Sequence, residues 1–241
     1  MQLTGIHHIT SVSAKIAENV DFYTNVLGLR LVKKSVNQDD VSAYHLFYAD
    51  KLGSPGTDMT FFDWPHIGPN VRGTEGIAGT AFRVASRMSL DFWSQRLEDK
   101  GVKKSRIIEF AGRELLPFED PEGQQLYLVN DQGAEFEGEI WQRPDIPDEN
   151  ALRGFYGVVI SVPSVARLDD IFKKVLNFVE VERTQWIDER SEAVIYTTRN
   201  NSRAGSEVWV LEQPHKGRAK LGAGGTHHVA FRVADFETQV K

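Results

Sequence analysis

The sequence feature that most limits the possible folds is an internal repeat. The stretch AFRVA occurs at residues 81–85 and again at 230–234, an offset of 149 residues. A looser match at the same offset sets DFYTNVLGLRLVKKS, from Asp21, over DIFKKVLNFVEVERT, from Asp170. Because two separate segments share one offset, we predict a duplicated unit of about this length.

Each unit divides once more. Four stretches that begin with glycine predict strands: GIHHITSVS, GIAGTAFRVAS, GFYGVVISVPS and GTHHVAFRVAD. The first three are followed by apolar residues at helical spacing, namely Val20, Tyr23 and Leu27, then Leu90, Trp93 and Leu97, then Leu168, Ile171 and Val175. Gly28 and Gly101 are expected to end the first two helices. About three strand-like runs follow each helix, so the repeated unit is strand, helix and three strands.

This pattern predicts an α+β fold built from βαβββ modules. We expect four modules, at residues 1–70, 71–135, 151–215 and 222–241, with the fourth truncated inside its helix. The acidic stretch 135–154, which carries Pro144 and Pro147, is predicted to connect the second module to the third.

The charge and amino-acid composition argue against a nucleic-acid partner and a membrane span. The net charge is −6 without a run of basic residues, which argues against a nucleic-acid partner. An apolar run of about 18 residues, as a membrane span needs, is absent. The N-terminus lacks a secretory signal and the chain has no cysteine, so we expect a cytoplasmic protein. A metal site would therefore use His, Asp or Glu.

Four of the seven histidines form two pairs, His7–His8 and His227–His228, at the start of the first and fourth predicted modules. Because side chains alternate along a strand, we expect only one histidine of each pair on a given face. His8 and Thr10 would share one face of the first strand.

The second and third modules lack such pairs. The matching position is near Gly79 in the second module, and Gly157 or Val158 in the third. None of these residues can bind a metal through its side chain. We therefore expect a metal site between the first and fourth modules, with the other two as a scaffold.

The chain resembles the vicinal oxygen chelate superfamily, which includes glyoxalase I, bleomycin- and fosfomycin-resistance proteins and extradiol dioxygenases. The resemblance is closest to the hydroquinone-type ring-cleaving dioxygenases. It rests on GIHHIT at 5–10, FYTNVLGLRLVKKSVNQDD at 22–40, YHLFYADKLGSPGTDMTFFDWP at 44–65, FEDPEG at 118–123 and GTHHVAFRV at 225–233.

The resemblance implies that His8 and His228 are metal ligands. It implies a third ligand, a glutamate on the last strand of the fourth module, which we expect beyond Lys241. Two imidazoles and one carboxylate suit Fe(II), although such a site also accepts Mn(II) or Zn(II).

His7 and His227 are expected beside these ligands as catalytic residues that orient a ligand, bond oxygen or move a proton. The alternative is that both face solvent. Thr10 is a third catalytic candidate, with an ordinary strand position as the alternative.

Other candidates favour structural roles. We expect His45 to be packed or hydrogen-bonded rather than a ligand, and His66 and His215 to lie on the surface. Three aromatic residues either build an apolar pocket or belong to the core: Phe61, Phe62 and Trp64.

The function we predict is an Fe(II)-dependent, ring-cleaving dioxygenase that acts on hydroquinone- or catechol-like aromatics with O₂. One alternative is a glyoxalase-like metal-dependent isomerase or thiol transferase. Another is a protein that binds aromatic compounds without turnover. A homodimer is compatible with the resemblance, and the sequence does not decide it.

Overall fold

The computed structural model describes residues 2–36, 43–198 and 205–235. Within these ranges, no helix has the length and apolar character that crossing a membrane would require.

The first quarter of the chain forms one strand, a helix and three strands. The elements are β1 (Leu3–Ser13), α1 (Ile16–Asp21) with the π-helical turn η1 (Phe22–Val26), β2 (Arg30–Val36), β3 (Tyr44–Ala49) and β4 (Asp58–Asp63). The next elements repeat this order: β5 (Gly76–Val84), α2 (Arg87–Asp99), β6 (Ile108–Phe110), β7 (Arg113–Glu119) and β8 (Gln125–Asn130).

A short 3₁₀ turn, η2 (Asp148–Asn150), interrupts the connection to the second half. The order then appears a third time: β9 (Phe155–Val162), α3 (Ala166–Asp170) with η3 (Ile171–Val175), β10 (Phe178–Gln185), β11 (Glu192–Thr198) and β12 (Glu207–Glu212). The last described element is β13 (Thr226–Val233).

In each of the three sets, the last strand pairs with the first one. The last strand returns parallel to the first, as β4 does beside β1, β8 beside β5 and β12 beside β9. Such a return needs a crossover, and a helix lies in each one. This mixed sheet with few helices confirms the predicted α+β class; the four module boundaries stay a proposal.

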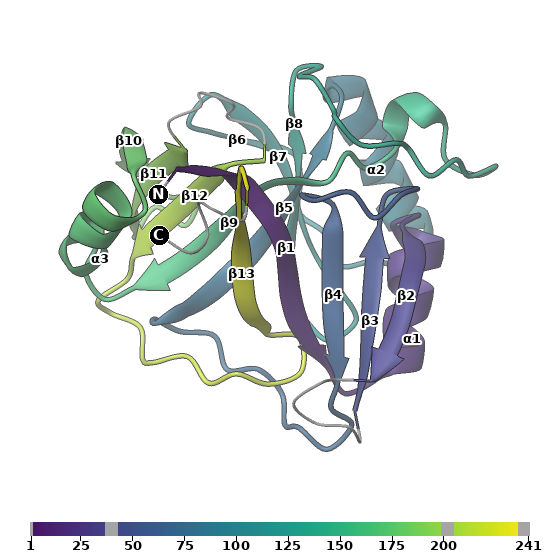
Figure 1. The fold of residues 1–241 in the computed structure, drawn as a ribbon, viewed down its shortest axis with the longest axis horizontal. Coiled ribbons are helices and arrows are strands. Elements are labelled where there is room, and N and C mark those ends of the chain that lie inside the picture. The colour runs from purple at the N-terminus through teal and green to yellow at the C-terminus, as the bar shows by residue number, and fades with distance from the viewer. Residues whose placement is uncertain (1, 37–42, 199–204, 236–241) are drawn as a thin grey trace.

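The strands form two groups (Figure 1). β13 pairs antiparallel with β1, so the first group runs β13-β1-β4-β3-β2. β5 pairs antiparallel with β9 and joins the second and third sets of strands. The groups meet where Thr226 of β13 pairs with Ile77 of β5. The first strand of the chain thus lies beside the last one described.

A residue with a left-handed backbone conformation follows each of η1, α2 and η3, namely Gly28, Gly101 and Asn177. Gly28 follows η1 with φ +73° and Gly101 follows α2 with φ +68°, as the sequence predicts. Asn177, at the offset of 149 from Gly28, follows η3 with φ 55°. Asparagine is the other residue that adopts this conformation readily.

The predicted apolar face of the third helix is partly wrong. Ile171 and Val175 are 46% and 61% exposed, whereas Phe172 is buried against Tyr196. At the offset of 149 residues Phe172 matches the buried Tyr23 of the first helix, so the predicted face was one residue out of register with it.

Two connections run side by side and join the strand groups. Residues 68–75 pair with residues 217–225 through Pro69–Ala223, Val71–Lys220 and Thr74–Arg218. We call these two segments the crossing linkers. They lead directly into β5 and β13, so they set where both strands begin.

Candidate metal centre

The two predicted ligands meet in the structure. His8 on β1 and His228 on β13 are 220 residues apart in sequence, yet their Nε2 atoms are 3.2 Å apart. Imidazole nitrogens bound to one ion at about 2.0–2.1 Å, at right angles, would be roughly 3.0 Å apart. The two side chains therefore fit two positions around a single divalent ion.

Both histidine pairs lie at β-bulges. In the β1–β13 ladder, Ile6 pairs with Phe231 and His8 with Ala230, which leaves His7 as the extra residue. Farther along, Thr10 pairs with His228 and Ser11 with Thr226, which leaves His227 as the extra residue. A bulge re-aims a side chain that regular alternation would send to the other face.

The bulges bring each first histidine onto its neighbour. The Nδ1 atoms of His7 and His8 are 3.0 Å apart, and those of His227 and His228 are 2.8 Å apart. The expectation that each pair divides between two faces is therefore wrong. A hydrogen bond at Nδ1 fixes the orientation of a ligand ring while its Nε2 stays available.

Burial keeps the ligand rings neutral. It is the main cause that lowers the pKa of His8 to about 4, with further lowering by the charges of His7, His228 and His45. Burial, followed by the charge of His227, also lowers the pKa of His228. Neutral imidazole is the form that binds a metal ion.

Thr10 does not line an open space. Its side chain is fully buried, and its Oγ1 lies 2.8 Å from Oγ1 of Thr60, its partner on β4. Its predicted catalytic role stays a prediction, and the contact that the structure shows is with another buried hydroxyl.

A third ligand is not found in the described part of the chain, where no three His, Asp or Glu residues come close enough to hold an ion. Asp58 is the carboxylate in register with His8, on β4. Burial raises its pKa to about 6, against the opposing charge of Lys33, and its Oδ1 is buried without a hydrogen bond. The predicted glutamate falls outside the described residues.

Aromatic side chains stand beside the histidines. Phe62 stacks on Trp64 with ring centres 5.3 Å apart, and the edge of His227 meets Phe62 at 5.5 Å. Phe61 points the other way and packs on Tyr23 in the core. Of the three predicted aromatics, two therefore border the candidate centre and one belongs to the core.

His45 is packed and hydrogen-bonded, as the sequence predicts, but its place in this wall was not foreseen. Its ring lies between Phe47, at 4.1 Å, and Phe62, at 4.5 Å. The alternation of strand residues 44–49 puts His45 and Phe47 on one face. The pairing of β3 with β4, which brings both to Phe62, is not visible in the sequence.

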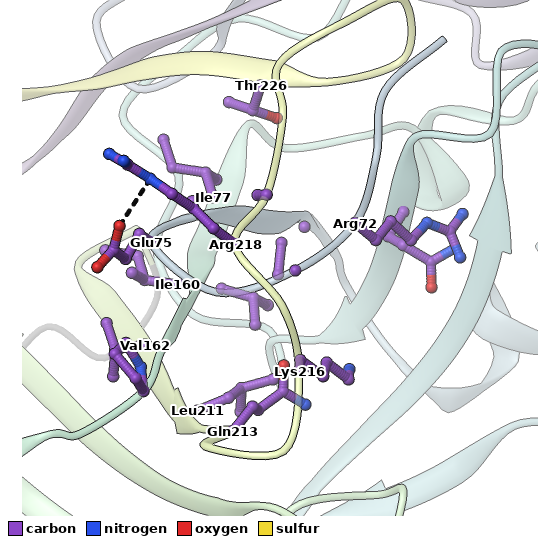
Figure 2. A pocket seen from close by; sticks show the side chains of 18 of the residues that line it. Arg72, Glu75, Ile77, Ile160, Val162, Leu211, Gln213, Lys216, Arg218 and Thr226 are labelled. Atoms are coloured by element: carbon purple, nitrogen blue, oxygen red, sulfur yellow. Dashed lines mark ion pairs between the residues drawn. The ribbon is translucent and has the colours of Figure 1, made fainter.

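A large cavity lies elsewhere. Its volume is about 820 Å³, and it lies between β5, β9 and the second crossing linker (Figure 2). Arg218 and Glu75 form an ion pair of 2.8 Å at its rim, and apolar residues such as Ile77, Ile160 and Leu211 line it. His227 is the one predicted site residue on its border, so the cavity is not the candidate centre.

The positions that match the two candidate ligands in the other strand group are closely packed glycines. A Cβ on Gly79 would lie 2.7 Å from the ring of Tyr127, and one on Gly157 would lie 2.6 Å from the carbonyl oxygen of Glu207. Glu207 is itself buried in a double ion pair with Arg113. A histidine therefore does not fit at either glycine without a shift of these neighbours.

The fold and the paired histidines define a family. The model of the Glyoxalase/Bleomycin resistance protein/Dioxygenase superfamily matches residues 5–128, and the chain belongs to this superfamily.

Individual relatives cover nearly the whole chain. MhqA of Bacillus subtilis (strain 168), provisionally named a ring-cleaving dioxygenase, is 39% identical over 98% of this chain and 74% of its own length. The chlorohydroquinone/hydroquinone 1,2-dioxygenase of Sphingobium indicum is 29% identical over 99% of this chain and 73% of its own length.

A solved structure agrees with both. The crystal structure of a provisionally named dioxygenase from Bacillus subtilis subsp. subtilis str. 168 has a TM-score of 0.86 and 33% identity, and covers 99% of this chain and 73% of its own. These relatives confirm the predicted class of enzyme, an oxidoreductase of the ring-cleaving dioxygenase kind.

Proposed function

We propose that this chain is an Fe(II)-dependent dioxygenase that opens a hydroquinone- or catechol-like ring with O₂. The observation that carries the proposal is the 3.2 Å approach of the His8 and His228 Nε2 atoms beside an aromatic wall. The name of the Sphingobium relative, a chlorohydroquinone/hydroquinone 1,2-dioxygenase, supports a hydroquinone-type substrate. A homodimer and a cytoplasmic location stay predictions.

The proposal assigns a role to each of the four paired histidines. His8 and His228 hold the ion, and His7 and His227 orient them through their Nδ1 atoms. When bound, Fe(II) would supply adjacent positions for a substrate oxygen and O₂ and a path for electrons between them. The same donors accept Mn(II) or Zn(II), so the identity of the ion belongs to the proposal.

His227 is best placed to move a proton. Its ring contacts the aromatic wall, with ring centres 5.5 Å from Phe62 and 6.0 Å from Trp64, and its side chain is exposed. A substrate ring stacked on this wall would therefore lie next to the imidazole. Thr10 supports the strand from within through its bond to Thr60.

The direct test is metal content together with oxygen uptake. The protein is loaded anaerobically with Fe(II), mixed with hydroquinone or methylhydroquinone, and followed for O₂ and ring-opened product. We expect one ion per chain and equal consumption of O₂ and substrate. His228→Ala should abolish both, whereas His66→Ala, an exposed histidine outside the centre, should leave both unchanged.

Two results would overturn the proposal. Tight metal binding without oxygen uptake would favour the isomerase or transferase alternative. Oxygen uptake that survives His228→Ala would mean that the reaction happens at another place.

A further inference from the structure

His45 makes a hydrogen bond in a place where an apolar side chain would pack equally well. It lies on β3, paired with Phe62 of β4, and its ring is held between two phenylalanine rings. A phenylalanine or leucine could fill that space. The imidazole instead places its Nε2 2.8 Å from Oγ1 of Thr60.

This contact extends into a chain of three side chains. Oγ1 of Thr60 also lies 2.8 Å from Oγ1 of Thr10, and Thr10 pairs across the sheet with His228. The two threonines are 1% and 0% exposed. This row of hydrogen-bonded side chains therefore runs across β3, β4 and β1 and ends beside His228, a candidate ligand.

The burial of Thr10 fixes the direction of the hydrogen bonds. Thr60 is the one hydrogen-bond partner recorded for the Thr10 hydroxyl among the described residues. If Thr10 did not donate to Thr60, its proton would be buried without an acceptor, which is costly. Thr10 therefore donates to Thr60, and Thr60 donates to Nε2 of His45.

The direction of the bonds decides the form of the imidazole. A neutral ring whose Nε2 accepts a hydrogen bond carries its proton on Nδ1. Burial, with the charges of His228 and Lys33, lowers the pKa of His45 to about 4, so the ring is neutral at neutral pH. For the Nδ1–H of His45, the described residues offer no hydrogen-bond acceptor.

We propose that this Nδ1–H recognises the second oxygen of a 1,4-dihydroxylated ring whose first oxygen lies at the His8–His228 centre. His45 is then a residue that determines specificity, and the inference rests on the proposed function. The rings of Phe62 and Phe47 on either side suit an aromatic substrate, and a half-buried N–H suits a hydroxyl oxygen. The two hydroxyls of a catechol are adjacent, so under this inference a hydroquinone, and not a catechol, bound by one oxygen at the centre presents its other oxygen to this donor.

Binding without turnover tests the inference. Affinities for hydroquinone and for phenol, which lacks the second oxygen, are measured anaerobically on the Zn(II)-loaded protein by quenching of tryptophan fluorescence. We expect His45→Phe to weaken hydroquinone about 3- to 10-fold, the loss of one hydrogen bond, and to leave phenol unchanged. His45→Gln keeps an acceptor for Thr60 and a donor for the ligand, so it should recover most of the hydroquinone affinity.

The outcomes separate this inference from the proposed function. If the unaltered protein binds neither ring, the proposed function fails. If it binds both and His45→Phe weakens them equally, or neither, then His45 does not recognise the second oxygen. Nitrogen-15 NMR of the metal-free protein gives an independent check, because the proton of His45 must be found on Nδ1; a proton on Nε2 would overturn the argument.

Discussion

At the scale of residues, the proposed metal centre depends on two histidines beside the candidate ligands. His7 and His227 each meet the Nδ1 atom of a predicted ligand. A group in this position orients the ligand ring, and its loss typically costs about 10- to 100-fold in metal affinity. We expect His7→Ala and His227→Ala each to weaken metal binding by that factor, in competition titrations against a chelator.

The matched control is His215→Ala, an exposed histidine that belongs to neither pair. Equal affinities for all three variants would mean that the first histidines have no orienting role, and that their bulges serve the backbone alone.

His45 also predicts a dependence of stability on pH. Its pKa is about 4 in the folded chain and near 6.5 in an unfolded one. Between these values the unfolded state binds more protons, so stability falls as the pH drops through this window. Asp58, with its pKa raised to about 6, acts in the opposite direction, so the parent must be compared with a variant.

We therefore expect His45→Phe to flatten the fall in the urea midpoint of the metal-free protein between about pH 7 and about pH 4.5. The effect is a fraction of the full linkage, because the ring is only half-buried. If the urea midpoint falls equally with pH in the unaltered protein and in His45→Phe, then the imidazole is equally solvated in the folded and unfolded states.

At the scale of elements, β9 and β12 approach too closely for a side chain between them. A Cβ on Gly157 would lie 2.6 Å from the backbone oxygen of Glu207. Since backbone cannot move aside cheaply, we expect Gly157→Ala to lower the free energy of unfolding by about 1–3 kcal/mol. Gly68→Ala, where no atom lies within 4 Å, should change it by less than about 0.5 kcal/mol. Denaturant titration measures both, and equal values would contradict the contact.

The element level is also where the sequence was most informative. One offset of 149 residues and four glycine-led strands were enough to predict the order of strands and helices along the chain. The meeting of His8 and His228 was implied by the family resemblance together with the two histidine pairs. The buried face of the third helix was misplaced by one residue, because Ile171 and Val175, like Phe172 and Leu176, are apolar residues four apart.

The details of the site were hidden for a different reason. A bulge depends on how two distant strands pair, and so does the contact of His45 with Thr60. Neither follows from the spacing of residues along one strand. For this reason the sequence implied His7 and His227 beside the two candidate ligands but not the bulges that turn them there, and it gave His45 no part in the centre.

At the scale of the whole molecule, the crossing linkers couple the two strand groups. Gly224, two residues before β13, has φ +77°, and a Cβ there would lie 2.2 Å from the carbonyl oxygen of Glu122. We expect Gly224→Ala to cost about 1–3 kcal/mol of stability and to weaken metal binding, because it displaces the strand that carries His228.

Gly217→Ala tests the same linker without strain, since its φ is not left-handed and no atom lies within 4 Å of its Cβ. Unfolding titrations and metal affinities of the two variants should differ clearly. If they match, the position of β13 does not depend on this linker.

The pairing of β1 with β13 also determines when during synthesis the two histidines can meet. A ribosome adds about 5–20 residues per second, so the 220 residues between His8 and His228 take roughly 10–40 s to make. Under the proposed function, His8 has no second imidazole with which to hold an ion during that interval. The metal centre can therefore form only after synthesis has reached His228 and the β1–β13 ladder has closed.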